Sequence, residues 1–178
     1  MKKKTGWSAI FLLISTTLLL SCNKYEDGPF MSLRSKDARI TGEWEMTDIY
    51  FQEKNDGVYL DEGTWEDGML TIVSEYDDET ETETFKYEIE MDIQKDGIIS
   101  WNRVLRDFEE SQTGIWNWEN NDIKKGGIDL PFLGLFKITR LTNDELVLSY
   151  EVLYDEQIVS TGEKEHEEFV LTYTFTKK

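Results

Sequence analysis

Several residue types on which whole classes of protein depend are almost missing from this chain. Its 178 residues include one cysteine, one histidine and two prolines. A single cysteine cannot form a disulfide within the chain, and a lone histidine without a cysteine partner cannot build a structural zinc site. The sequence has no Gly-x-Ser-x-Gly motif, and a Ser-His-Asp triad would have to use His166. We therefore expect no metal cofactor and no enzymatic activity.

Basic residues are scarce as well. Nineteen Lys and Arg stand against 37 Asp and Glu, which gives a formal net charge of -18. Binding to a phosphate backbone depends on Lys and Arg side chains that release counterions, so we expect no nucleic-acid partner. The acidic stretch at residues 77–83 matches no EF-hand spacing and is predicted to be a solvated hairpin tip, with a calcium site as the alternative.

Long apolar runs are absent except near the N-terminus. Lys2, Lys3 and Lys4 precede a mostly apolar stretch at residues 9–20, which is shorter than the roughly 20 residues of a membrane-spanning helix. This arrangement predicts a secretory signal peptide. Cys22 follows directly, in Leu19-Leu20-Ser21-Cys22, which resembles the lipobox of bacterial lipoproteins. That resemblance implies cleavage before Cys22 and covalent lipid on its thiol; the alternative is an unmodified cysteine.

The lipobox also sets the expected domain organisation. Residues 1–21 are predicted to be the lipoprotein signal peptide, residues 22–38 the lipidated N-terminus and tether, and residues 39–178 one domain. Removing the signal changes the formal charge from -18 to -21 and leaves about 157 residues, enough for one hydrophobic core. Glu26-Asp27 resembles the acidic export signals of Bacteroidetes surface lipoproteins; the alternative is an ordinary polar tether. We expect an outer-membrane protein held by its lipid, exposed on the cell surface if the export signal applies.

From Ile40 onward, apolar and polar residues alternate as in β-strands with one buried face. Turns are predicted at residues 95–97 and 142–145, a loop around Trp65, and the best place for one helical turn at 102–110. Closing such a sheet buries its apolar face and removes its edges, so we expect an all-β fold, an antiparallel up-and-down barrel of about eight strands. The predicted strands are residues 42–51, 68–76, 84–93, 98–105, 113–118, 136–140, 146–154 and 169–176.

Short motifs in these strands resemble a known family. Gly42-Glu43-Trp44, at the start of the first strand, resembles the Gly-x-Trp signature of lipocalins. The stretches at residues 114–118, 138–142 and 173–177 are similar to parts of lipocalin-like lipoproteins of the Bacteroidetes. The resemblance implies a barrel with Trp44 at its closed end and a small apolar or amphipathic ligand in its interior. It also makes Arg140 the candidate for the arginine that packs on this tryptophan in lipocalins.

The candidate ligand-binding residues are aromatic side chains expected on the inner faces of the strands. Trp116 and Trp118 share one face of a strand, where they either stack on a planar ligand or fill the core. Two interpretations stay open: a hollow barrel that binds a small molecule, and a filled barrel that binds a glycan or a protein through its loops and outer wall. We expect a monomer with no cofactor besides the lipid on Cys22. The full candidate set is Trp44, Tyr87, Trp101, Trp116, Trp118, Tyr150 and Tyr173.

Overall fold

Eleven antiparallel strands and one short helix make up the described part of the chain. The computed structural model describes residues 35–178, except residue 57 and the segments 77–78, 120–125 and 158–163. Cys22, the signal peptide and most of the predicted tether lie outside the described residues. Among the described residues, no helix has the length and apolar character needed to cross a membrane. The elements are α2 (Lys36–Ile40), β1 (Gly42–Asn55), β2 (Val58–Glu66), β3 (Met69–Tyr76), β4 (Glu79–Ile93), β5 (Ile98–Leu105), β6 (Phe108–Ile115), β7 (Asn117–Trp118), β8 (Gly127–Leu130), β9 (Gly134–Leu141), β10 (Glu145–Gln157) and β11 (Lys164–Lys177).

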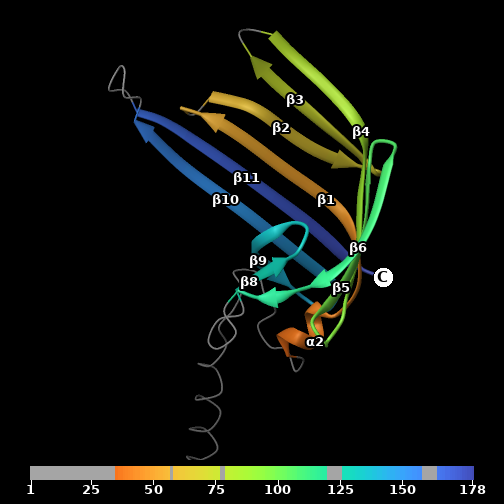
Figure 1. The fold of residues 1–178 in the computed structure, drawn as a ribbon. Helices are drawn as coiled ribbons and strands as arrows, with labels where there is room; N and C mark the ends of the chain where they lie inside the picture. The colour runs from red at the N-terminus through yellow and green to blue at the C-terminus, as the bar shows by residue number, and fades with distance from the viewer. Residues whose placement is uncertain (1–34, 57, 77–78, 120–125, 158–163) are drawn as a thin grey trace, which may run out of the picture.

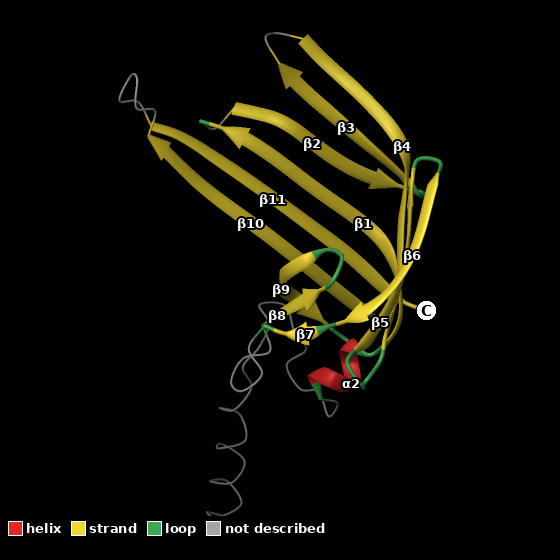
Figure 2. Cartoon of the chain, in the orientation of Figure 1, coloured by secondary structure: helices red, strands yellow, loops and turns green. Residues whose placement is uncertain are grey.

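The strands form one sheet in which most strands pair with their neighbours in the sequence. Their order across the sheet is β6-β5-β4-β3-β2-β1-β11-β10-β9-β8-β7. The first strand also pairs with the last, from Trp44 opposite Lys177 to Asn55 opposite Glu167. The predicted all-β class and the antiparallel up-and-down connectivity are therefore confirmed, and Figures 1 and 2 show how strongly the sheet coils.

At one end, which we call the closed end, the sheet forms a small closed barrel. Residues 42–45 of β1 pair there directly with residues 90–93 of β4. On the other side, β6 pairs with β5 and continues through Trp116 into β7, which pairs with β8. The continuous segment β6–β7 thus pairs with β5 in its first part and with β8 in its second part, and it joins the two edges of the sheet. The members of the ring are β1, β4, β5, β6–β7, β8, β9, β10 and β11.

Beyond the ring, the longer strands continue as a curved wall. The β2–β3 hairpin separates β1 from the first half of β4, since β1 pairs with β2 from Tyr50 onward and β4 pairs with β3 through residues 79–86. Strand β9 pairs with β10 only as far as Ser149, whereas β10 runs on beside β11 to Gln157. The front of the wall, between β6 and β10, is therefore open (Figures 1 and 2).

A bulge in β1 keeps the apolar residues of this strand on the inner side. Trp44 and Met46 are buried, the register shifts between Met46 and Asp48, and Ile49 is the next buried residue. An extra residue in one strand reverses which side chains face inward. The bulge explains why strict alternation breaks within this strand although both of its halves contribute to the core.

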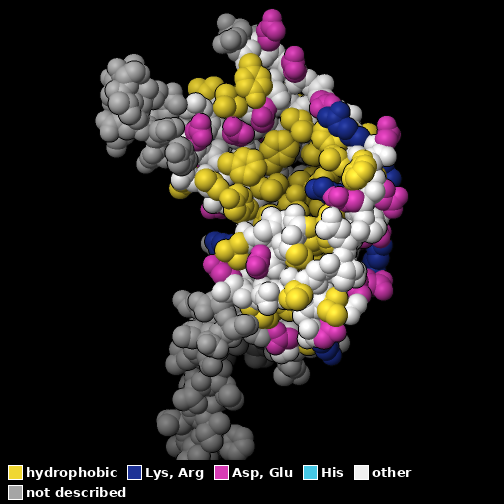
Figure 3. Space-filling view, in the orientation of Figure 1, with side chains coloured by type: hydrophobic (Ala, Val, Ile, Leu, Met, Phe, Trp, Pro, Cys, Tyr) yellow, Lys and Arg dark blue, Asp and Glu magenta, His cyan; other side chains and the backbone are white. Residues whose placement is uncertain are grey.

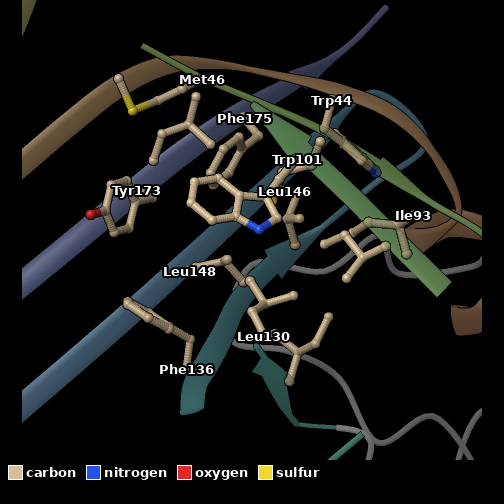
Figure 4. Packing of buried hydrophobic residues seen from close by; sticks show 14 of the residues in the cluster. Trp44, Met46, Ile93, Trp101, Leu130, Phe136, Leu146, Leu148, Tyr173 and Phe175 are labelled. Atoms are coloured by element: carbon tan, nitrogen blue, oxygen red, sulfur yellow. The ribbon is translucent and has the colours of Figure 1, made fainter. Parts of the chain in front are cut away.

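Side chains fill the closed end (Figure 4). Trp44 and Phe175 are fully buried, and Trp101 stacks on Phe132 with ring centroids 4.0 Å apart. Each buried large apolar side chain contributes about 1.5–3 kcal/mol relative to exposure. The interior of the ring is therefore a packed core.

Helix α2 packs at the closed end and begins with a cap. The Ser35 hydroxyl accepts a hydrogen bond from the Ala38 N–H at 3.1 Å, which satisfies one of the free amides of the first turn. The Trp44 indole donates to the Ile40 carbonyl oxygen at 2.7 Å, which ties the helix to β1.

A lysine covers the outer face of this tryptophan. Lys177 Nζ lies 4.8 Å from the Trp44 ring centroid and donates to the Thr41 carbonyl oxygen at 2.6 Å. The prediction that Arg140 packs on Trp44 is wrong, because Arg140 forms an ion pair with Glu145 at 3.0 Å. A cation does lie over the ring, but it comes from the last strand.

The strand count is larger than predicted for identifiable reasons. The stretch around Trp65 is strand β2 and not a loop, and residues 127–130 form the short strand β8. The predicted strand at 113–118 is split at Trp116 into the end of β6 and β7. No helical turn occurs at 102–110, where Arg106 has a φ of 57° in the turn between β5 and β6.

Candidate functional site

The curved wall beyond the ring bounds a hollow lined with apolar side chains (Figure 3). These side chains are half-buried and pack against the core from β1, β2, β3, β4, β5 and β11. They continue the inward-facing positions of the ring: Leu70 lies opposite Phe85, and Phe51 lies opposite Leu171. The lining residues of this space, which we call the hollow, are Phe51, Trp65, Ile72, Phe85, Leu105 and Leu171.

Gly63 shapes one side of the hollow. It lies opposite Phe51 across the β1–β2 pair, and the Phe51 ring occupies the space that a side chain at Gly63 would take. The absence of a Cβ at this one position lets the ring lie against β2.

Two buried tyrosines form the floor of the hollow. Tyr87 on β4 and Tyr173 on β11 are joined through their hydroxyl groups at 3.1 Å. Burial is the main cause that raises the pKa of Tyr173 above its ordinary value of 10, and the neighbouring Tyr87 adds to the effect. The Trp65 indole donates to the Tyr87 carbonyl oxygen at 2.7 Å. The floor therefore contains one pair of polar hydroxyl groups, and the hydrogen bonds that fix it come from β2, β4 and β11.

The arginines that face the hollow are paired with carboxylates. Arg103 on β5 forms an ion pair with Glu110 on β6, and its guanidinium lies 5.5 Å from the Trp101 ring centroid. Arg106 pairs with Glu83 at 2.6 Å. These contacts neutralise both cations, so neither carries an unbalanced positive charge into the hollow.

The rim of the hollow, at the far ends of the strands, is acidic. Glu53 on β1 lies opposite Asp61 on β2. Both residues are on the inner face of the sheet, as are Phe51 and Gly63, which form the next pair on that face, deeper in the hollow. The Tyr76 hydroxyl donates to Asp61 Oδ2 at 3.3 Å. The charge of Asp61 raises the pKa of Tyr76, with a smaller contribution from Glu53, so the negative potential of both carboxylates is felt at this hydroxyl. Figure 3 shows acidic side chains around the apolar hollow.

Glu53 also lines a small pocket of about 190 Å³ at the ends of β1, β10 and β11. We call it the rim pocket. Val152 and Phe169 form its apolar wall, and Glu167 and Glu168 complete it. Glu168 is paired with Lys54 at 3.8 Å. The rim pocket therefore combines apolar surface with negative charge.

The four tryptophans predicted to bind ligand are all buried in the core: Trp44, Trp101, Trp116 and Trp118. Trp116 and Trp118 do share a face and touch edge to face, with centroids 5.6 Å apart. Their indole N–H groups donate to the Gln94 carbonyl oxygen and to Asp37 Oδ1. Of the two alternatives for this pair, the structure favours core packing. A ligand role for the four tryptophans remains a prediction that no observation here tests.

The three predicted tyrosines lie nearer the hollow. Tyr87 and Tyr173 are its floor, at 8% and 5% exposure. Tyr150 is 41% exposed, and its ring lies between Phe136 and Phe169 with centroid distances of 5.8 and 6.4 Å. Tyr150 is therefore the member of the predicted set that a ligand in the hollow can reach most directly.

Several lining residues were missed by sequence reasoning. Trp65 was expected to lie in a loop, yet it is half-buried in β2. Phe51 was placed in a strand but not assigned to the site. The sequence did contain one indication of this lining: Phe85 and Tyr87 are two residues apart on β4, and residues two apart on a strand share a face. Which other strands complete that face depends on the pairing of distant segments.

An open groove of about 480 Å³ lies on the outer wall across β1, β4, β5 and β6. Most of the residues that line it are polar, and several are already bonded to one another. Ser100 and Thr113 share a hydrogen bond at 3.2 Å, and Asn102 accepts one from Ser111 at 2.9 Å. This groove faces away from the hollow.

The described residues contain no group of three His, Cys, Asp or Glu side chains able to hold a metal ion. His166 is exposed on β11, where its backbone N–H donates to Asp56 Oδ1 at 3.1 Å. Residues 77–78 of the acidic stretch lie outside the described residues.

Comparison of the chain with protein-family models, curated proteins and solved structures finds no match.

Proposed function

We propose that this protein is a lipid-anchored lipoprotein of the outer membrane or cell surface whose barrel binds a small apolar or amphipathic molecule without catalysing a reaction. The lipid anchor rests on Cys22 and the signal that precedes it. Ligand binding rests on the hollow, so the two parts of the proposal depend on separate observations.

The apolar lining of the hollow is the observation that carries the binding proposal. Leaving apolar surface in water costs about 25 cal/mol per Å², and exposed apolar patches commonly mark binding sites. Phe51, Phe85 and Leu171 keep part of their surface outside the core although the ring below them is fully packed. A small molecule with an apolar body would cover this surface.

Within this proposal, the barrel is lipocalin-like in its closed end. Gly42 precedes the buried Trp44, and Lys177 lies over that ring in the place expected of an arginine. The eight-membered ring supports the same assignment. The binding space differs from an enclosed barrel interior, because it lies beyond the packed ring and opens between β6 and β10.

Titration with a neutral naphthylamine dye, whose fluorescence rises in apolar surroundings, tests the hollow. We expect saturable binding to the wild type. Tyr150→Ala should weaken it about fivefold, the equivalent of about 1 kcal/mol of lost apolar contact. Because Tyr150 is 41% exposed, its truncation should cost less stability than the about 3–5 kcal/mol expected for a fully buried aromatic.

Leu153→Ala is the matched control on the same strand. Leu153 is 68% exposed, and its odd position on β10 places it on the face opposite Tyr150. Absence of saturable dye binding, or an equal loss of affinity in both variants, would refute binding in the hollow.

The outer groove supports a second candidate function, the binding of a glycan or protein partner. Its hydroxyl, amide and carboxylate groups, such as Ser100, Asn102 and Asp92, are the donors and acceptors that polyhydroxylated ligands use. Asn102→Ala should then reduce retention of the protein on immobilised glycans or on whole cells, whereas Tyr150→Ala should not. Loss with Tyr150→Ala alone would exclude the outer groove as the binding site.

A further inference from the structure

We infer that the ligand of the hollow is an amphiphile with a cationic group, such as a long-chain ammonium, whose charged end lies at the rim near Glu53. This inference rests on the proposed binding function and adds the charge of the ligand to it. The apolar body would lie on the hollow, and the cationic group would lie where the inner face changes from apolar to acidic.

One row of neighbouring residues shows this change across four strands. Val152 lies opposite Phe169, Phe169 lies opposite Glu53, and Glu53 lies opposite Asp61. Residues directly opposite one another on antiparallel strands have Cβ atoms about 4.5–5.5 Å apart. The row therefore passes from two apolar side chains to two carboxylates within the width of a small molecule.

The rim pocket brings both kinds of surface into one space. Val152 and Phe169 contact the same pocket as Glu53 and Glu167. Its volume of about 190 Å³ leaves room for an ammonium group and a few methylenes. The pocket is lined by three carboxylates and by no basic side chain, and of the three only Glu168 has a described ion pair, with Lys54.

The balance of charge on the inner face favours a cation over an anion. Beyond the ring, Arg103 and Arg106 are the described basic residues of this face, and each is already paired with a carboxylate, although Nε of Arg103 donates to no described group. An anionic ligand would have to displace Glu110 or Glu83 from these pairs. Acidic positions outnumber basic ones on this face, as judged from the strand register: Glu53, Asp61, Glu79, Glu81, Glu83, Glu110 and Glu167.

Two acceptor atoms near the rim make no hydrogen bond within the described part of the chain. They are Oδ1 of Asp61 and Oδ1 of Asn55, and both are buried from solvent. A buried acceptor without a partner costs about 1–3 kcal/mol, more when it is charged. An ammonium group has three donors and no acceptor, so it would satisfy these oxygens where ligand binding uncovers them.

Displacement of the neutral dye by chain-matched amphiphiles tests the inference on the purified protein, below the micellar concentration of each probe. The probes are dodecylammonium, dodecanoate and dodecanol. We expect dodecylammonium to displace the dye at a concentration about tenfold lower than dodecanoate, which corresponds to about 1.4 kcal/mol. Raising the ionic strength should reduce this preference, because the rim is partly exposed to solvent and screening shortens the reach of its charges.

Glu53→Gln and Asp61→Asn remove one charge each with little change of shape. Each should weaken dodecylammonium about two- to fivefold, as expected for a partly exposed ion pair, and leave dodecanol unchanged. Glu62→Gln is the matched control: it removes the same charge from the exposed outer face of β2, next to Asp61. It should leave the affinity of all three probes unchanged.

The outcomes separate this inference from the proposed function. Equal or tighter binding of dodecanoate would overturn the cationic preference while leaving the hollow as a binding site. An equal effect of Glu62→Gln and Glu53→Gln would also overturn it, because the net charge of the protein would then explain the preference. Failure of the dye itself to bind would refute the proposed function and the inference with it. Should Glu53→Gln fail to fold, Asp61→Asn gives the same comparison.

Discussion

The tyrosine pair in the floor of the hollow should show strong energetic coupling. In Tyr173→Phe, the Tyr87 hydroxyl stays buried but loses its partner at 3.1 Å. Leaving a buried polar group unpaired costs about 1–3 kcal/mol, and Tyr87→Phe should have a cost in the same range for the same reason. The double variant removes both hydroxyls and leaves two rings of the same shape, so its cost should be close to zero.

Urea denaturation followed by tryptophan fluorescence measures these differences at neutral pH. The single costs sum to about 2–6 kcal/mol, so the cost of the double variant should fall short of that sum by about 2 kcal/mol or more. Additive costs would mean that the two hydroxyls do not depend on each other, and would refute the account of the floor.

The same pair predicts how stability changes in alkali. Burial raises the pKa of Tyr173 in the folded protein above the ordinary value of 10 that applies to the unfolded chain. The unfolded state therefore releases this proton first as the pH rises, and the free energy of unfolding falls above about pH 10. The stabilisation is fully present below pH 10. The double variant should lose less stability between pH 9 and 11 than the wild type; an unchanged slope would contradict the burial of the pair.

Two further predictions concern the anchor and the shape of the hollow. Cys22→Ala should abolish partition of the protein with membranes, measured by fractionation of cells, and parent-like partition of the variant would disprove the lipid anchor. Gly63→Ala should push the Phe51 ring away from β2, lower the unfolding free energy by about 1–3 kcal/mol and weaken dye binding. The outward-facing neighbour gives the control, Thr64→Ala, which should stay within about 0.5 kcal/mol of the wild type; similar values for both variants would show that the ring does not need this space.

The strands that enclose the core could be predicted from the sequence, because burial imposes the two-residue period there. Strand β5 was predicted with its observed bounds, Ile98–Leu105. The turn at 142–145 was also predicted, and Thr142 Oγ1 accepts there from the Glu145 N–H at 2.9 Å. In each case the local residues alone determine the structure.

Strand β2 could not be recognised in the same way. Its inner face includes Asp61 and Gly63, which break the apolar alternation. Gly63 is buried but has no side chain, because the Phe51 ring fills that space, and Asp61 lies at the acidic rim. Of Asp61, Gly63 and Trp65 on the inner face of this strand, only Trp65 is a large apolar residue, so no alternation marks the strand and Trp65 appeared to belong to a loop.

The candidate site was predictable only in part because it depends on register between distant segments. The aromatic inner face of β4 was visible, including Tyr87. The row that joins Phe169 to Glu53 arises from the pairing of β11 with β1, which no local pattern contains. The tryptophans were assigned to the site since an eight-stranded barrel has room either for side chains or for one small ligand, and composition does not distinguish the two.

The pairing of β1 with β11 also constrains the order of events in folding. Trp44 faces Lys177, so the two strands at the centre of the wall come from opposite ends of the domain. Contacts this distant along the chain slow folding, because a long loop must close before they form. The ring can close only after β11 has been synthesised. A chain that lacks β11 would lose a strand from the centre of the sheet and not from its edge.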